Sequence, residues 1–312
     1  MKQTKLVSNN CLYYKQFQPV IILLQIFGRL QLYSNKNGKF ASSIISWRML
    51  YCIVSYLLQT YLVLLPTAKR IRAITADDSN YDKLIFSLHV LTYLSIHFHL
   101  PFTFWVQSHQ IADYINDWMK FQENWNKLYR KEMKLSLKST SYSIVFVSIP
   151  SIVLFLIFEN YSTLHDPWIY LLPHLCTLGS TMLIFCIWYC TCIELGRLSR
   201  IMISELSKNL EIRPNSNFLR NWRYLWIDLM SLTSSLGNSF SKIIISIMIT
   251  YSATFLLGFF NSVTKLVIND TSFKTMGYAS ATSWSLCIMF LFCDAGHHAT
   301  YNVSIYIPFL IY

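Results

Sequence analysis

The residues best suited to bind a small molecule are a few polar and aromatic side chains inside long apolar stretches. They are His89, Tyr93, His174, Tyr251 and Trp284. Imidazole, hydroxyl and indole groups can each hydrogen-bond a ligand, and the aromatic rings add stacking faces. Such groups in an apolar wall are typical of sites for small organic molecules. The other interpretation is that each is an ordinary packing or interfacial residue, and the sequence leaves both open.

Motifs for catalysis and metal binding do not occur in the sequence. It holds no Gly-x-Ser-x-Gly, no His-Glu-x-x-His and no phosphate-cradling glycine loop. His97 and His99 are two residues apart, and His297 and His298 are adjacent. In a helix, each pair therefore points to different faces, which disfavours a shared metal. We predict no enzymatic activity, no bound metal and no cofactor.

Composition places the candidate residues in a membrane protein. Hydrophobic residues make up 54% of the 312 residues, and charged residues make up 13%, against about 25% charged in soluble domains. The net charge of +11 is better explained by basic loops on the cytoplasmic side of a bilayer than by nucleic-acid binding. The sequence thus predicts an all-α, polytopic membrane protein with the lipid bilayer as a partner.

Six apolar segments have about the length that a helix needs to cross a bilayer. They cover residues 47–67, 84–107, 141–158, 168–192, 238–263 and 280–300. Residues 1–312 form a single transmembrane domain in this interpretation. A short apolar helix at Pro19–Leu30 is predicted to lie along the membrane, followed by a turn at Asn35–Gly38.

Two of the helices are predicted to continue beyond the membrane. In residues 217–267 no turn signal separates an amphipathic half from an apolar half, and one stripe recurs at helical spacing: Trp222, Leu225, Leu229 and Leu232. After the segment 84–107, a similar stripe consists of Ile111, Ile115, Trp118, Trp125 and Leu128. The alternatives are a separate surface helix in the first case and a solvated helix with snorkelling aromatics in the second.

Charge and glycosylation sequons agree on one orientation. Nineteen of the 26 Lys and Arg residues lie in the segments 1–48, 108–140 and 193–230. The positive-inside rule therefore places these segments, and the N-terminus, in the cytoplasm. Sequons at Asn160 and Asn269 then fall in outer loops, where they are candidate glycosylation sites, whereas a third at Asn302 lies inside.

Several stretches resemble insect gustatory receptors, members of the seven-helix chemoreceptor superfamily that also includes odorant receptors. The resemblance covers nearly the whole chain and is carried by FQPVIILLQIFGRL, DWMKFQENWNKLYRK, ELGRLSRIMISELSKNL, FLRNWRYLWIDLMSLTSSLGNSF and LFCDAGHHATYNV. It implies seven spans, a cytoplasmic N-terminus and a plasma-membrane location. It also implies a tetrameric ligand-gated cation channel, formed by identical or different subunits, with a shared cytoplasmic anchor domain. The seventh helix would line the pore, and a small tastant would bind among the outer halves of the other helices.

One departure concerns the end of the family's last helix, which normally reads Thr-Tyr, several apolar residues and Gln-Phe. Here Thr300-Tyr301 is followed by NVSIYIPFLIY without Gln-Phe, and it falls directly after the sixth segment. We therefore expect six of seven spans, and a truncated or degenerate receptor that forms no pore alone. The predicted function is a gustatory receptor subunit; the alternatives are an odorant-type receptor and a polytopic transporter.

Overall fold

Helices account for most of the part of the chain that the computed structural model describes, residues 11–35, 38–75, 81–161, 167–212, 216–268 and 273–304. In chain order the elements are α2 (Leu12–Ile26), β1 (Leu32–Ser34), β2 (Phe40–Ser42), α3 (Trp47–Thr75), α4 (Tyr81–Tyr129), α5 (Leu137–Glu159), the 3-10 turn η2 (Trp168–Tyr170), α6 (Leu171–Ile212), α7 (Ser216–Val267) and α8 (Phe273–Ser304). Two strands of three residues each are a small addition to the all-α fold that the sequence predicts.

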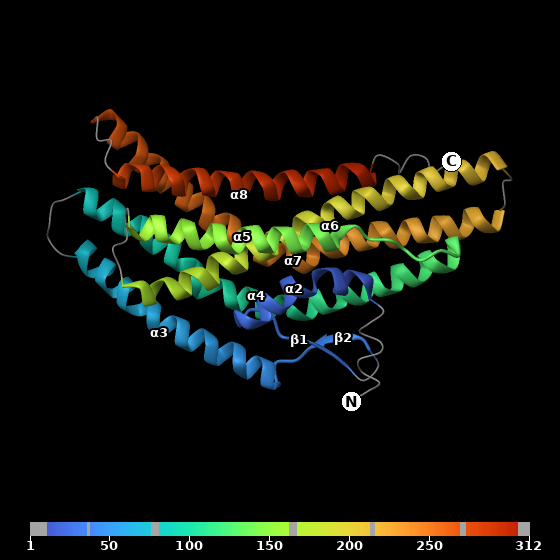
Figure 1. Ribbon diagram of the computed structural model, residues 1–312, viewed down its shortest axis with the longest axis horizontal. Coiled ribbons are helices and arrows are strands. Elements are labelled where there is room, and N and C mark those ends of the chain that lie inside the picture. The colour runs from blue at the N-terminus through green and yellow to red at the C-terminus, as the bar shows by residue number, and fades with distance from the viewer. Residues whose placement is uncertain are drawn as a thin grey trace.

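The long helices run roughly along the long axis of the molecule (Figure 1). At the left end of that view lie the end of α3, the start of α4, the end of α5, the start of α6, the end of α7 and the start of α8. At the right end, α4, α6 and α7 run on past the start of α5 and the end of α8. These two ends of the bundle are called the left end and the right end, as they lie in Figure 1. Helix α7 packs along both α4 and α8 and links the two sides of the bundle.

Five helices within the described residues are long and apolar enough to cross a membrane: Trp47–Arg72, Leu137–Glu159, Leu171–Glu211, Ser216–Val267 and Thr275–Tyr301. Each contains one of the predicted spans or most of it. The remaining prediction, 84–107, lies in α4, which is not among the five. Histidine, threonine and glutamine residues lower the hydropathy of that helix. The chain is thus a polytopic helical protein, and the membrane boundaries within each helix stay predictions.

Both helical extensions are present as continuous helices. Helix α7 runs for 52 residues without a break, and the four residues of its predicted stripe are buried. Helix α4 runs for 49 residues, and its stripe is buried except for Leu128, which is half-buried. A separate surface helix in the first case and a solvated helix in the second are therefore wrong. The two stripes face one another along the extensive α4–α7 contact.

The N-terminal helix begins and ends earlier than the predicted range of residues 19–30, and one face of it is buried by other helices. Helix α2 begins at Leu12, contains Pro19 in its interior and packs against α4, α5 and α6. Phe17, Val20 and Leu24 are fully buried, so one face of the helix is part of the protein core, and its placement along the membrane stays a prediction. The sequence predicts an apolar helix here but not its packing partners, because lipid and a protein core favour the same residue types.

A β-hairpin follows α2 and is anchored to α4. The predicted turn is present, because Asn35 N donates to Lys39 O at 2.7 Å and Gly38 adopts a φ of 75°. The strands pair antiparallel with Tyr33 opposite Ala41. The Asn116 side chain accepts from Phe40 N and donates to Phe40 O, both at 2.9 Å. This amide completes the free edge of β2 much as a third strand would.

Candidate ligand-binding site

Tyr251 and Trp284 are the two predicted site residues that the fold brings together. The Tyr251 side chain is buried on α7, and its hydroxyl lies 3.4 Å from Thr181 Oγ1 of α6. The indole of Trp284, on α8, lies next to that hydroxyl and stacks on Phe155 of α5 with ring centroids 5.3 Å apart. The Trp284 Nε1 atom is buried and is placed to donate toward this hydroxyl. Four helices thus converge on one cluster of aromatic rings and hydroxyl groups.

His89 occupies a different contact, between α4, α7 and α8. Its imidazole is buried and packs edge-on against the Tyr278 ring, with centroids 5.9 Å apart. Its Nδ1 atom has no hydrogen-bond partner among the described residues. Gly258 of α7 makes this close approach possible, because a Cβ there would lie 2.5 Å from Thr282 Oγ1 and 3.3 Å from His89 Cε1. Its ring contact is with Tyr278, whereas the Tyr251 hydroxyl faces Thr181.

His174 and Tyr93 belong to helices α6 and α4. His174 is buried on α6 and interacts electrostatically with His97 of α4. Tyr93 lies in α4, but its side chain falls outside the described residues. Of the predicted residues, Tyr251 and Trp284 thus meet, His89 packs against Tyr278, and His174 lies near His97; the assignment of all five to one ligand site stays a prediction.

His97 and His99 face different helices, as their spacing of two residues predicts. His97 Nε2 lies 3.2 Å from Thr60 Oγ1 on α3. His99 instead contacts α7, with Ser246 Oγ at 2.6 Å and Thr250 Oγ1 at 3.2 Å. Within the described ranges, no group of three or more His, Cys, Asp or Glu residues could hold a metal ion.

A polar cluster around Arg29 escaped the sequence analysis. Arg29 was counted among the basic residues of the N-terminal segment, yet its side chain is fully buried. The guanidinium donates to Ser180 and Thr177 of α6, both at 3.3 Å, and to Gln59 of α3 at 3.0 Å. A loop arginine gives no local signal of burial, so only the packing of α2 against α6 reveals this cluster.

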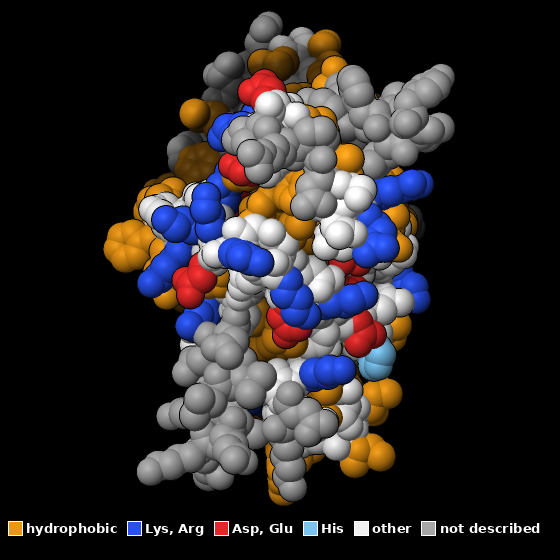
Figure 2. Space-filling model, turned by 90° about the vertical axis from the view of Figure 1, so that its right-hand side faces the viewer, with side chains coloured by type: hydrophobic (Ala, Val, Ile, Leu, Met, Phe, Trp, Pro, Cys, Tyr) orange, Lys and Arg blue, Asp and Glu red, His pale blue; other side chains and the backbone are white. Residues whose placement is uncertain are grey.

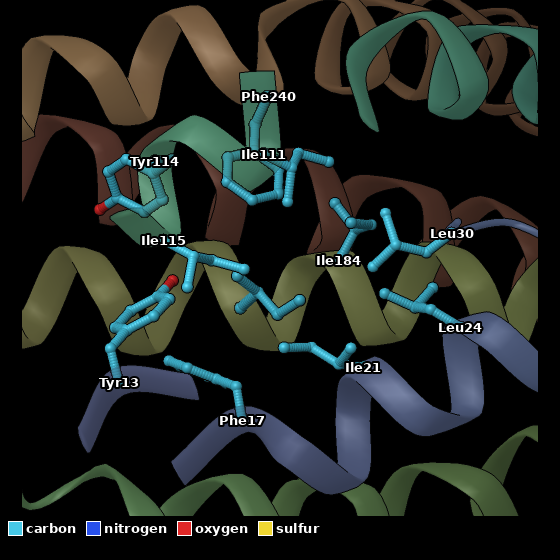
Figure 3. Close-up of a pocket in the computed structure, with 11 residues that line it drawn as sticks. Tyr13, Phe17, Ile21, Leu24, Leu30, Ile111, Tyr114, Ile115, Ile184 and Phe240 are labelled. Atoms are coloured by element: carbon cyan, nitrogen blue, oxygen red, sulfur yellow. The ribbon is translucent and has the colours of Figure 1, made fainter. Parts of the chain in front are cut away.

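The cavity enclosed by α2, α4, α6 and α7 is too small for an organic ligand (Figure 3). Phe17 and Leu24 of α2 point toward Ile111, Ile184 and Phe240 across it. Its volume is about 10 Å³, which is room for about one water molecule. Its walls are apolar, so even a water molecule would find few partners there, and we read it as a packing defect.

A larger cleft lies at the right end, between the extensions of α4, α6 and α7. It encloses about 810 Å³ and is lined by Trp125, Leu128, Tyr129, Lys131, Glu132, Lys134, Arg197, Leu198, Ile201, Glu205, Asn209 and Phe218. Figure 2 looks onto this end and shows Lys and Arg side chains gathered there, with Asp and Glu among them. Because the cleft is open and is lined by both acidic and basic side chains, we interpret it as a solvent-filled surface cleft.

The three sequon asparagines lie in different parts of the molecule, and one of them is not described by the structure. Asn160 lies at the end of α5, at the left end of the molecule, and its side chain is mostly buried. Asn269 falls outside the described residues, and Asn302 lies in the last turn of α8. Helix α8 starts at the left end and runs toward the right, so Asn302 lies well away from the left end, where Asn160 is found.

Comparison with known proteins covers nearly the whole chain. A family model described as 7tm Chemosensory receptor matches residues 17–303. Gustatory and odorant receptor 22 of Anopheles gambiae is 22% identical over 309 residues, which are 94% of this chain and 64% of the relative. Gustatory and odorant receptor 21a of Drosophila melanogaster is 22% identical over 313 residues, with 94% and 66% covered. The chain spans just under two thirds of the length of these relatives.

Proposed function

Because the chain belongs to the 7tm chemosensory receptor family, we propose that it is a gustatory receptor that acts as a subunit of a ligand-gated cation channel. The observation that carries this proposal is the family match over residues 17–303. The relatives are named gustatory and odorant receptors, which supports a small organic molecule as the ligand. The same names keep an odorant-type receptor as the second candidate.

The aromatic cluster of Tyr251 and Trp284 is the ligand site that the geometry favours. The Trp284 indole N–H and the Tyr251 hydroxyl lie next to each other in this cluster, and both groups can hydrogen-bond a ligand. A ligand that carries a hydroxyl or carbonyl oxygen would accept from Trp284 Nε1 and lie against the ring of Phe155, which stacks on this indole. Four helices surround this cluster, so a bound ligand would bias their relative positions, as gating requires.

The proposed orientation places the right end and the N-terminus in the cytoplasm. Lys and Arg side chains gather at the right end (Figure 2), which is the side that the positive-inside rule assigns to the cytoplasm. The extensions of α4, α6 and α7 at this end pack together through buried aromatic residues, among them Trp118, Phe121 and Trp226. We propose that they form an anchor domain through which subunits assemble as homo- or hetero-tetramers in the plasma membrane.

Whole-cell recording during perfusion with small organic compounds tests the channel function. The chain is expressed alone and together with a full-length relative, and its surface delivery is measured in both cases. We expect a ligand-evoked cation current that Trp284→Ala weakens at least about tenfold in apparent affinity, the effect of one lost buried contact and hydrogen bond. The matched control is Trp47→Ala, because Trp47 is 85% exposed. Surface-delivered protein that gives no current in either combination would contradict the proposal.

A further inference from the structure

Arg29 is a fully buried cation. Its hydrogen-bond partners among the described residues are three neutral side chains. The described groups that interact with it electrostatically are Cys52, Tyr56, Cys176 and His97, and none of these four is a carboxylate. An arginine remains protonated in proteins, and a buried charge without a counter-ion is costly. The fold therefore holds a positive charge that an anion would stabilise.

Part of the guanidinium is still unused. The Nη2 atom donates to Gln59 and Thr177, and Nε donates to Ser180. The Nη1 atom is buried and has no hydrogen-bond partner among the described residues. These three bonds hold the guanidinium plane between α3 and α6, so the free Nη1 donors have a fixed direction.

His97 offers a second unused group beside this arginine. Its Nδ1 atom is also buried without a partner in the described part of the chain. Its Nε2 atom lies 3.2 Å from Thr60 Oγ1, and the Tyr56 ring stacks on the imidazole with centroids 5.6 Å apart. When Nε2 accepts from the Thr60 hydroxyl, the proton resides on Nδ1, which is then free to donate. His174 interacts with His97 on the α6 side.

We propose that Arg29 and His97 form a binding site for a small monovalent anion, either the carboxylate of an organic molecule or a halide ion. The anion would accept from Arg29 Nη1 and His97 Nδ1 and would neutralise the guanidinium. The site joins the end of α2 to α3, α4 and α6, so anion binding would lock the N-terminal helix onto the bundle. The proposal is independent of channel function, because it rests only on buried donors and charge.

Thermal unfolding of the purified full-length chain in detergent tests this site. Sodium acetate, sodium chloride and sodium gluconate are titrated at constant ionic strength, so that screening is the same in all three series. We expect the apparent Tm to rise saturably with acetate or chloride in the millimolar range, and not with bulky gluconate. A rise with acetate alone assigns an organic carboxylate, and a rise with chloride alone assigns a halide.

Two variants separate anion binding from a merely structural role of the arginine. Arg29→Gln should abolish the anion-dependent rise or weaken its midpoint at least about tenfold, as loss of a buried charged partner does. The matched control Arg48→Gln removes an exposed arginine and should leave the titration unchanged. His97→Phe keeps an aromatic ring against Tyr56 and removes both nitrogens. It should weaken the midpoint while the protein still folds, and it decides the question if Arg29→Gln does not fold.

Three results would overturn the proposal. One is a wild-type Tm that shows no saturable dependence on acetate or chloride, which would mean that water satisfies the free donors. Another is an identical titration for Arg29→Gln and Arg48→Gln, which would mean that the anions act elsewhere. The third is an unchanged midpoint in His97→Phe, which would remove His97 from the site.

Discussion

Gln107 of α4 inserts its side-chain amide into the backbone of α7. Its Oε1 accepts from Ile243 N at 3.1 Å, and its Nε2 donates to Asn238 O at 3.1 Å. Both backbone groups belong to the continuous helix α7, so the Gln107 amide bonds to α7 in addition to that helix's own hydrogen bonds. The Gln107 side chain is fully buried, and it lies where the apolar half of each helix meets its extension. One side chain thus couples the two longest helices at the predicted membrane boundary.

Replacing Gln107 with leucine should destabilise the protein. The substitution keeps the side-chain size but removes two hydrogen bonds between α4 and α7, each of which contributes about 0.5–1.5 kcal/mol. We expect the apparent Tm in detergent to fall by a few degrees. The control is Gln18→Leu, because Gln18 is exposed on α2 and should shift the Tm little. Equal effects of the two substitutions would mean that the amide is not needed.

Gly258 and Gly237 of α7 should respond in opposite directions to alanine. At Gly258 the new methyl group would meet Thr282 Oγ1 at 2.5 Å, whereas at Gly237 nothing lies within 4 Å. We expect Gly258→Ala to cost about 1–3 kcal/mol through overpacking. Gly237→Ala should gain up to about 1 kcal/mol from helix propensity. Apparent Tm values of both variants check this, and a stabilised Gly258→Ala would show that α7 and α8 are not in close contact there.

The continuous helices could be predicted because their signals are local. The stripe from Trp222 to Leu232 keeps helical spacing, and no turn residue interrupts it. Burial of that stripe follows from its chemistry alone. The all-α fold and the family resemblance have the same origin, since both depend on patterns that extend over many residues.

The clustering of side chains could not be predicted, because it depends on how the helices rotate against each other. Tyr251 and Trp284 meet only because α7 and α8 turn those faces toward α6 and α5. His89 faces Tyr278 instead. Arg29 follows Gly28, whose φ of 71° turns the chain into the bundle. The spacing of residues in the sequence determines neither the rotation of a helix against its neighbours nor the direction of the chain after Gly28.

The ion pair between Glu194 and Arg197 should be worth more than an ordinary surface pair. Glu194 is 1% exposed and also accepts from Ser136 Oγ, while Arg197 donates to Lys134 O. This network ties the segment before α5 to α6. Because Arg197 retains some solvent contact, we expect Glu194→Gln to cost roughly 1–3 kcal/mol, below the 3–5 kcal/mol of a fully buried pair.

The matched control for this pair is Glu205→Gln. Glu205 lies 3.6 Å from Lys208, and both side chains are far more exposed, so its loss should cost less than about 1 kcal/mol. The comparison is made by apparent Tm in the same detergent. A cost for Glu205→Gln that matches or exceeds that of Glu194→Gln would contradict the assignment of Glu194 to a buried network.

Glycosylation mapping should report which end of the molecule faces outward. With the N-terminus in the cytoplasm, Asn160 and Asn269 face the lumen during synthesis, where the sequons are accessible before the helices pack. Asn302 then stays on the opposite side. We expect two mobility shifts on gels that enzymatic deglycosylation removes, one lost in Asn160→Gln and the other in Asn269→Gln, with Asn302→Gln unchanged. Modification at Asn302, with none at Asn269, would reverse the orientation. It would also place the basic right end outside, against the charge distribution of the whole chain.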